Sequence, residues 1–287
     1  MTDNIRPLAQ KKSTAPGIDF CAEEVRRCDY GLYVSTLFAL PKERGALFAL
    51  YALKIALGRI KHKVTEPMMG LIRLQWWRDA VEKLFHGKVL HHDVLHALLL
   101  ALQNGAAWQE EDFQKLIDAY EMDFQTREIQ TVEAWQRHTE TVALPLFSAA
   151  NKVSGLEGDK ETIAIIARCH EISRQLLAIP SVLAGKGKIL LPNEILQILG
   201  HNEYGLTKAD IENRLKPFMQ QIVGQNLADL KTLPWKQIKK SAPLLPGVIA
   251  QRKFEHIKRY DYALFDAAND YSDDLLGFRL LMKRLLP

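Results

Sequence analysis

The sequence predicts an all-α protein built as one helical bundle. Nearly every segment repeats apolar residues at intervals of three to four, the spacing that gives a helix one buried face. No segment alternates apolar and polar residues between hairpin turns, which is the pattern of a half-buried strand. The chain has 287 residues, of which 47% are hydrophobic, and no long Pro-, Gly- or Ser-rich linker interrupts it. We expect a flexible N-terminal tail over residues 1–17 and a single helical domain over residues 18–287.

Local signals set the order of the expected helices. Pro41 suits the first turn of the third helix, because its missing N–H is not needed there. Thr65 can cap the fourth helix, and Gly87 ends it. On that helix we interpret Trp76 and Trp77 as packing anchors, one facing inward and the other an adjoining helix. Besides the fourth helix, the expected helices cover about 19–30, 32–40, 41–64, 92–103, 109–126, 131–153, 159–184, 208–232, 244–262 and 272–285, with one short helix in the link 185–207.

Composition limits the class of partner and the compartment. The 38 Lys and Arg residues against 34 Asp and Glu residues leave a net charge of only +4, which does not indicate a nucleic-acid partner. The N-terminus lacks the apolar core of a secretory signal, although its basic and hydroxyl residues leave a transit peptide as an alternative. No run approaches the roughly 18 uncharged apolar residues of a membrane span. We expect a soluble, cytoplasmic protein whose three cysteines are reduced and buried.

The histidine-rich segment HGKVLHHDVLH raises the question of a metal site. His92 and His96 are four residues apart, a spacing that places two imidazoles on one helical face. A tetrahedral zinc site needs further ligands, and none is spaced to match. We interpret this segment as a solvated helix start, with Asp93 supporting the N-terminus.

Two groups of carboxylates are candidates for acid–base or metal chemistry. Acidic pairs four residues apart can hold Mg²⁺ when two such pairs face each other across a cavity. We interpret Asp270, Asp273 and Asp274 as part of the cap of the last helix, with Ser272 at the N-cap. The other group is expected to be solvated or locally paired: Asp118, Glu121, Asp123 and Glu128. The nucleotide-binding and hydrolase motifs GxGxxG, GxxxxGK[ST], GxSxG and HExxH do not occur.

Several blocks of the chain resemble the squalene and phytoene synthases, which are all-α head-to-head prenyl synthases. These blocks are CAEEVRRCDYGLYVSTLFALPKERGALFALYALKIAL, TEPMMGLIRLQWWRDAVEKLF, AYEMDF and ISRQLLAIPSVLAGKGKILLPNEIL. Their order and spacing agree with that family over about residues 20–200. The resemblance implies a single isoprenoid-synthase-type bundle.

The resemblance also implies where catalytic carboxylates would lie. The family uses two aspartate-rich motifs with carboxylates at i and i+4, which hold Mg²⁺ against the diphosphate groups of the substrates. In this chain the first pair of positions falls on Gly58 and His62, and the second near Val182 and Lys186. No Asp or Glu occurs anywhere from residue 172 to residue 193. Pro180 is expected to bend or end the helix there.

A retained scaffold without the acidic motifs resembles one branch of the family, the non-catalytic assembly factors of respiratory complex I. The shared blocks read RRCDYGLY, VTEPMMGLIRLQWW and AIPSVLAGKGKILLP. The resemblance implies a pseudoenzyme with no catalytic residues and no cofactor, whose partner is a complex I subunit or assembly intermediate. It also implies a location at the inner membrane surface, in the mitochondrial matrix if the source is eukaryotic. The alternative is an active prenyl transferase that uses other carboxylates, such as Asp118 or Asp123, together with Mg²⁺.

One set of residues is a candidate binding site for an anionic head group or an isoprenoid lipid. If the family's cavity persists, basic side chains could replace magnesium and bind the anion directly. The competing interpretation is a solvated basic helix end that complements the helix dipole, with Tyr51 and Gln175 satisfying buried hydrogen bonds. The full set of candidates is Tyr51, Lys54, Arg59, Lys61, His62, Gln175, Lys186 and Lys188.

Overall fold

The computed structural model describes residues 16–64, 66–126, 128–155, 159–185, 189–200 and 207–285, and within them it confirms the all-α prediction. The helices of the N-terminal half are α1 (Pro16–Cys28), α2 (Tyr30–Leu37), α3 (Pro41–Lys63), α4 (Pro67–Phe85), α5 (Asp93–Gln103), α6 (Glu110–Gln125) and α7 (Val132–Val153). The C-terminal half contains α8 (Lys160–Leu183), α9 (Asn193–Gly200), α10 (Lys208–Lys231), α11 (Trp235–Ile238), the 3₁₀ turn η2 (Ala242–Leu244), α12 (Pro246–Arg259), α13 (Leu264–Asp270) and α14 (Leu276–Leu285). Most predicted boundaries lie within a few residues of these.

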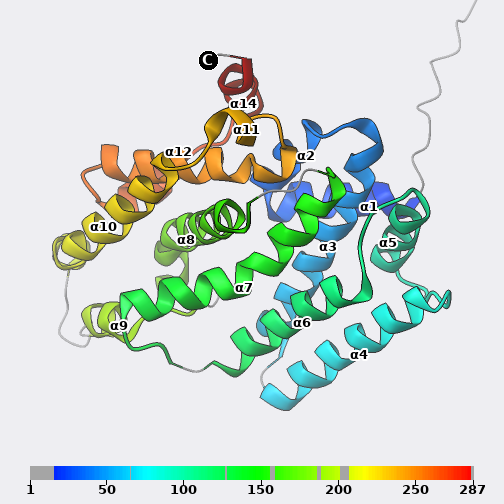
Figure 1. The fold of residues 1–287 in the computed structure, drawn as a ribbon. Helices are drawn as coiled ribbons and strands as arrows, with labels where there is room; N and C mark the ends of the chain where they lie inside the picture. The colour runs from blue at the N-terminus through cyan, green and yellow to red at the C-terminus, as the bar shows by residue number, and fades with distance from the viewer. Residues whose placement is uncertain are drawn as a thin grey trace, which may run out of the picture.

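The helices pack side by side around α3 and α8. Figure 1 shows α4, α6, α7 and α8 following one another across the molecule, and α12 covers the far side of α8. Helix α3 runs behind this row and packs against α1, α5, α6 and α7. Because α3 has neighbours on several sides, its central residues are buried on nearly every face, as an apolar helix must be.

A second, smaller core lies at one end of the bundle. There α14 packs Leu276 and Leu280 against α2 and α12. The other members of this cluster are Val34, Leu245, Val248 and Ile249. Nearly all the other buried apolar residues that the structure describes belong to one large core.

The structure corrects several expectations about helix ends. The tail was predicted over residues 1–17, but Pro16 and Gly17 already belong to α1; residues 1–15 lie outside the described residues, as does Thr65. Pro180 was expected to bend or end α8; the helix continues through it for three further residues, so it does not end there. A proline removes one N–H donor and so one helical hydrogen bond, but the turn after it can still close, as the bond from Ala184 N to the Pro180 carbonyl shows.

The last helix starts later than predicted. Ser272 Oγ accepts a hydrogen bond from Asp274 N, but α14 begins at Leu276, so Ser272 closes a turn before the helix and is not its N-cap. The sequence analysis also missed α11, η2 and α13, since elements of three to seven residues are too short to show a helical period.

Helix α2 begins with a cap that the sequence analysis did not identify. Asp29 accepts a hydrogen bond from Leu32 N at 3.1 Å, which satisfies one of the free N–H groups of the first turn. The cap fixes Asp29 at the junction of α1 and α2, with its other carboxylate oxygen turned toward α3.

Candidate functional site

A cavity of about 290 Å³ lies between α3, α6, α7 and α8. Its walls are mostly aliphatic and aromatic, and polar side chains reach it from the C-terminal half of α3 and from the middle of α8. Five of the predicted site residues line it: Lys54, Arg59, Lys61, His62 and Gln175. Tyr51 is buried one turn before Lys54 on α3, and Lys186 and Lys188 lie outside the described residues.

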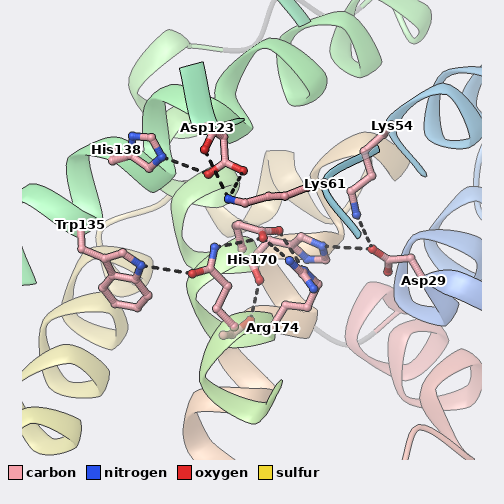
Figure 2. A network of polar contacts seen from close by, with 11 residues as sticks. Asp29, Lys54, Lys61, Asp123, Trp135, His138, His170 and Arg174 are labelled. Carbon is pink, nitrogen blue, oxygen red and sulfur yellow. Dashed lines mark hydrogen bonds and ion pairs between the residues drawn. The ribbon is translucent and has the colours of Figure 1, made fainter. Parts of the chain in front are cut away.

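The basic end of α3 meets carboxylates from other helices. Lys54 Nζ lies 3.0 Å from Asp29 Oδ2, and Lys61 Nζ lies 3.0 Å from Asp123 Oδ2 on α6. Figure 2 shows both pairs. Arg59 pairs with Glu24 and donates to Cys28 Sγ. His62 and Lys63 are exposed at the end of the helix. Lys54, Arg59 and Lys61 are therefore each paired with a carboxylate, at the start of α2, on α1 and on α6 respectively.

Asp29 is the most enclosed carboxylate of the group. Burial alone would raise the pKa of its carboxyl, but the charge of Lys54 holds that pKa well below its usual range. His170 Nε2 lies 3.8 Å from Asp29 Oδ2, beyond hydrogen-bond distance. Burial lowers the pKa of His170, and this effect exceeds the influence of Asp29. The structure therefore holds an ionised Asp29 beside a neutral imidazole.

Asp123 forms the second paired carboxylate at the cavity. Its Oδ1 lies 3.2 Å from His138 Nε2 on α7, in addition to the contact with Lys61 (Figure 2). Burial would raise the pKa of Asp123, but His138 and Lys61 lower it. The neighbouring Asp118 and Glu121 instead pair with Arg78 of α4.

The polar face of α8 forms a chain of hydrogen bonds across the cavity wall. Glu171 and Arg174 form an ion pair within one turn, with 3.0 Å between Oε2 and Nε. Gln175 Nε2 donates to Glu171 Oε1 at 3.1 Å, and Trp135 Nε1 donates to Gln175 Oε1 at 3.2 Å (Figure 2). Arg174 holds the pKa of Glu171 far below its usual range against the opposing effect of burial. Part of Arg174, 41% of its side chain, stays accessible, and Arg174 is among the residues that line the cavity.

Tyr51 and Gln175 differ in how well their polar atoms are satisfied by hydrogen bonds. Gln175 makes hydrogen bonds within the chain, as predicted by the interpretation that competes with a binding role. The Tyr51 hydroxyl is buried and has no hydrogen-bond partner among the described residues. Burial, followed by the charge of Asp29, raises the pKa of Tyr51, so the phenol is neutral.

Five residues at this site were not identified from the sequence as site residues. They are Asp29, His138, His170, Glu171 and Arg174. Asp29 stands in the RRCDYGLY block, and the resemblance of this block to the assembly-factor branch could have marked Asp29 as a candidate. His170, Glu171 and Arg174 lie on α8 and His138 on α7, and only the packing of α7 against α8 and α3 brings them to the same cavity.

A second groove of about 340 Å³ lies between α1, α3 and α4. Trp77 is buried, but Trp76 is 41% exposed in this groove, so only one tryptophan serves as a packing anchor. His92 caps α5 by accepting from Val94 N, and its ring packs against Trp77 with 5.0 Å between ring centroids. Within the described residues, no group of three or more His, Cys, Asp and Glu side chains is arranged to hold a metal ion.

None of the described helices combines the length and the apolar character that crossing a lipid bilayer requires.

Comparisons with known proteins give the family. The squalene/phytoene synthase family model matches residues 25–272. The human complex I assembly factor 6 is 23% identical over 274 residues, which cover 92% of this chain and 80% of that protein. The assembly factor 6 homologue of Drosophila melanogaster is also 23% identical and covers 94% of this chain and 84% of its own length.

Two solved structures have the same fold. The squalene synthase HpnC of Alicyclobacillus acidocaldarius superposes with a TM-score of 0.63 at 16% identity, covering 86% of this chain and 94% of that one. A dehydrosqualene synthase superposes with a TM-score of 0.66 at 14% identity, covering 93% and 95%. At these identities the likeness shows the fold alone, and it confirms the predicted isoprenoid-synthase-type bundle.

Proposed function

The chain belongs to the squalene/phytoene synthase family, and we propose that it is a non-catalytic member that acts by binding during the assembly of respiratory complex I. The relatives that match over more than nine-tenths of the chain carry the name complex I assembly factor 6, which supports this role. A complex I subunit or an assembly intermediate is then the partner. The site of action is the inner membrane surface, on the matrix side if the source is eukaryotic.

The proposal that the chain is non-catalytic rests on the pairing of carboxylates with basic residues at the cavity. Gly58 and His62 occupy the positions where the family resemblance places the first acidic pair. The carboxylates that do line the cavity, Asp123 and Glu171, are each paired with a cation of this chain. A magnesium ion would have to displace Lys61 or Arg174 from these carboxylates, and the remaining ammonium and guanidinium charges would repel it. The donor set therefore does not fit the metal on which prenyl transfer in this family depends.

The assembly role is tested by deleting the gene in the source organism. We expect a loss of complex I activity and of the fully assembled complex on native gels, and recovery when the chain is expressed again. Unchanged complex I in the deletion strain would contradict the assembly role.

The same strain separates binding from catalysis. Of the two carboxylates named for the alternative, an active prenyl transferase, only Asp123 lines the cavity; an Asp123→Asn variant removes it, while the new amide can still accept from Lys61. We expect this variant to restore complex I as well as the wild type does, with Asp118→Asn, whose carboxylate contacts Arg78, as a matched control. Restoration by Asp118→Asn alone would favour the alternative.

Turnover is tested directly with purified protein. We expect no release of diphosphate from farnesyl or geranylgeranyl diphosphate in the presence of Mg²⁺. Release above that of a heat-denatured sample, abolished by Asp123→Asn, would establish a working prenyl transferase.

The cavity remains a candidate site for an anionic head group or an isoprenoid lipid. Lys54 and Lys61 are engaged by Asp29 and Asp123, so a bound anion would compete with these carboxylates. Titration of the protein with farnesyl diphosphate, without Mg²⁺, tests this proposal. We expect weaker binding after Lys61→Gln, and unchanged binding would contradict a role for this lysine.

A further inference from the structure

Helix α14 presents apolar side chains on two opposite faces. Leu276 and Leu280 point inward and belong to the smaller core. Phe278, Leu281 and Met282 are spaced at i, i+3 and i+4, so they share one face. That face is exposed: Phe278 is 61%, Leu281 42% and Met282 37% accessible. Leu275, just before the helix, is 57% exposed.

The helix is held at one end of the molecule. Figure 1 shows α14 at the top of the view, beside α11, while α4 lies at the opposite end. Arg284 fastens its last turn by donating to the carbonyls of Phe38 and Lys240, at 2.9 and 3.2 Å. Leu37 and Leu40, on either side of Phe38, are 41% and 56% exposed. The exposed apolar surface therefore continues from α14 to the end of α2.

The charged residues of α11, of the turn after it and of α14 are all basic, while Asp273 and Asp274 stand just before Leu275. No acidic residue occurs from 275 to 287 or from 231 to 252. The cations that flank the apolar face of α14 are Arg279 and Lys283, and α11 and its following turn add Lys236 and Lys240. Within the described residues, none of these four forms an ion pair with a carboxylate, in contrast to the basic residues at the cavity.

We propose that α14, with Lys236 and Lys240, docks on an anionic lipid bilayer. An outward apolar face flanked by lysine and arginine is the arrangement of a helix that lies in the head-group region of a membrane, where the apolar side chains reach the acyl chains and the cations face lipid phosphates. The surface is a protruding helix at the end of the bundle, and neither cavity includes its residues. A flat bilayer fits such a surface better than a peptide, which needs a groove.

The proposal does not depend on the role in complex I assembly. Helix α14 lies beyond residue 272, where the family match ends, whereas Lys236 and Lys240 lie within the match.

The test is co-sedimentation of the full chain with lipid vesicles. We expect binding to vesicles of phosphatidylcholine mixed with phosphatidylglycerol, weaker binding to phosphatidylcholine alone, and release by salt. An Arg279→Gln/Lys283→Gln variant should bind the mixed vesicles roughly 25-fold more weakly, because each basic residue near an anionic surface contributes about a fivefold factor in affinity. Phe278→Gln/Leu281→Gln should also bind more weakly, including at high salt.

A matched control lies at the other end of the molecule. Met69 and Ile72 of α4 are 46% and 54% exposed, so Met69→Gln/Ile72→Gln removes a similar apolar area. We expect this variant to bind vesicles like the wild type. Loss of binding in the α4 variant, with α14 variants unaffected, would overturn the proposal.

Hydrogen exchange on the wild-type chain provides a second measurement that needs no variant. Amides of residues 275–285 should become protected when anionic vesicles are added, while those of α4 should not change. The proposal is overturned if the chain fails to bind vesicles, or if Phe278→Gln/Leu281→Gln only dissolves a dimer of this chain, which would make the surface a protein interface.

Discussion

Lys54 Nζ and Asp29 Oδ2 lie 3.0 Å apart where the end of α1 meets the middle of α3, with only 16% and 8% of the two side chains exposed. Asp29 has a second role at this point, because its other oxygen caps α2. One carboxylate thus links three helices and stabilises a lysine at the cavity wall. Removing the charge and removing the cap are different losses, and two substitutions separate them.

We expect Asp29→Asn to lower the free energy of unfolding by about 3 kcal/mol, because it leaves Lys54 buried without its counter-charge. The amide oxygen can still accept from Leu32 N, so the cap remains. Asp29→Ala should cost about 1 kcal/mol more, the usual contribution of an N-cap side chain. Urea unfolding of the three proteins measures both differences.

The control for this prediction removes both charges. Asp29→Asn/Lys54→Met leaves neither member of the pair ionised, so its loss should be well below the sum of the two single losses. Additive losses would mean that the two charges do not stabilise each other.

His170 should make the stability depend on pH below neutrality. Its pKa is lowered from 6.5 by burial, so the folded protein prefers the neutral imidazole while the unfolded chain takes up a proton near pH 6.5. The stabilising contribution is therefore complete above pH 6.5 and is lost as the pH falls toward the folded pKa. We expect the free energy of unfolding to fall as the pH is lowered below 6.5, from this group alone.

The measurement is urea unfolding of the wild type and of His170→Gln across this range. The free energy of unfolding of the variant should decrease less than that of the wild type as the pH falls. His92→Gln is a comparison, because burial also lowers the pKa of His92, which is less enclosed than His170. An identical pH dependence in wild type and His170→Gln would contradict a neutral, buried His170.

The three cysteines differ in exposure, contrary to the sequence analysis, and this difference predicts their reactivity. All three were expected to be buried, but Cys28 is exposed at the end of α1, where Arg59 donates to its sulfur. Burial raises the pKa of Cys21 and of Cys169 to about 12, so neither is a thiolate at neutral pH. Native protein should react with one equivalent of Ellman's reagent and denatured protein with three. Cys28→Ser should abolish the native reaction, and a remaining fast thiol would show that Cys21 or Cys169 is accessible.

The fold could be predicted from the sequence because helical periodicity is a local property. The long helices α3, α7 and α8 each carry enough turns for the buried face to be recognised, and their predicted bounds agree with the structure. The four-residue α11 has no such signal. The basic end of α3 was identified as unusual, but its partners were not.

The partners of these basic residues could not be predicted, because ion pairs across helices depend on packing. Lys61 and Asp123 are 62 residues apart in the chain, and no local pattern joins them. Asp123 was grouped with Asp118 and Glu121, which share its helix, but it lies on the face toward the cavity while the other two meet Arg78. Choosing between those faces requires the position of α6 relative to α3 and α4.

Two glycines that face different neighbours should respond in opposite directions to alanine. A Cβ at Gly58 would lie 3.6 Å from the ring of Tyr120, an ordinary contact, whereas a Cβ at Gly70 would lie 2.2 Å from Phe124 Cζ. Glycine inside a helix costs about 0.5–1 kcal/mol relative to alanine. We therefore expect Gly58→Ala to raise the free energy of unfolding by that amount. Gly70→Ala should lower it by about 1–3 kcal/mol, because the Phe124 ring must move out of the interface between α4 and α6.

Thermal and urea unfolding of the two variants measure both effects under the same conditions. A stabilised Gly58→Ala would mean that packing leaves room for a larger side chain at this position, so the absence of a carboxylate there is not imposed by the fold. If Gly58→Ala instead destabilises the protein, the backbone at residue 58 is needed for the approach of α6, and the glycine has a structural cause that is independent of the cavity's charges.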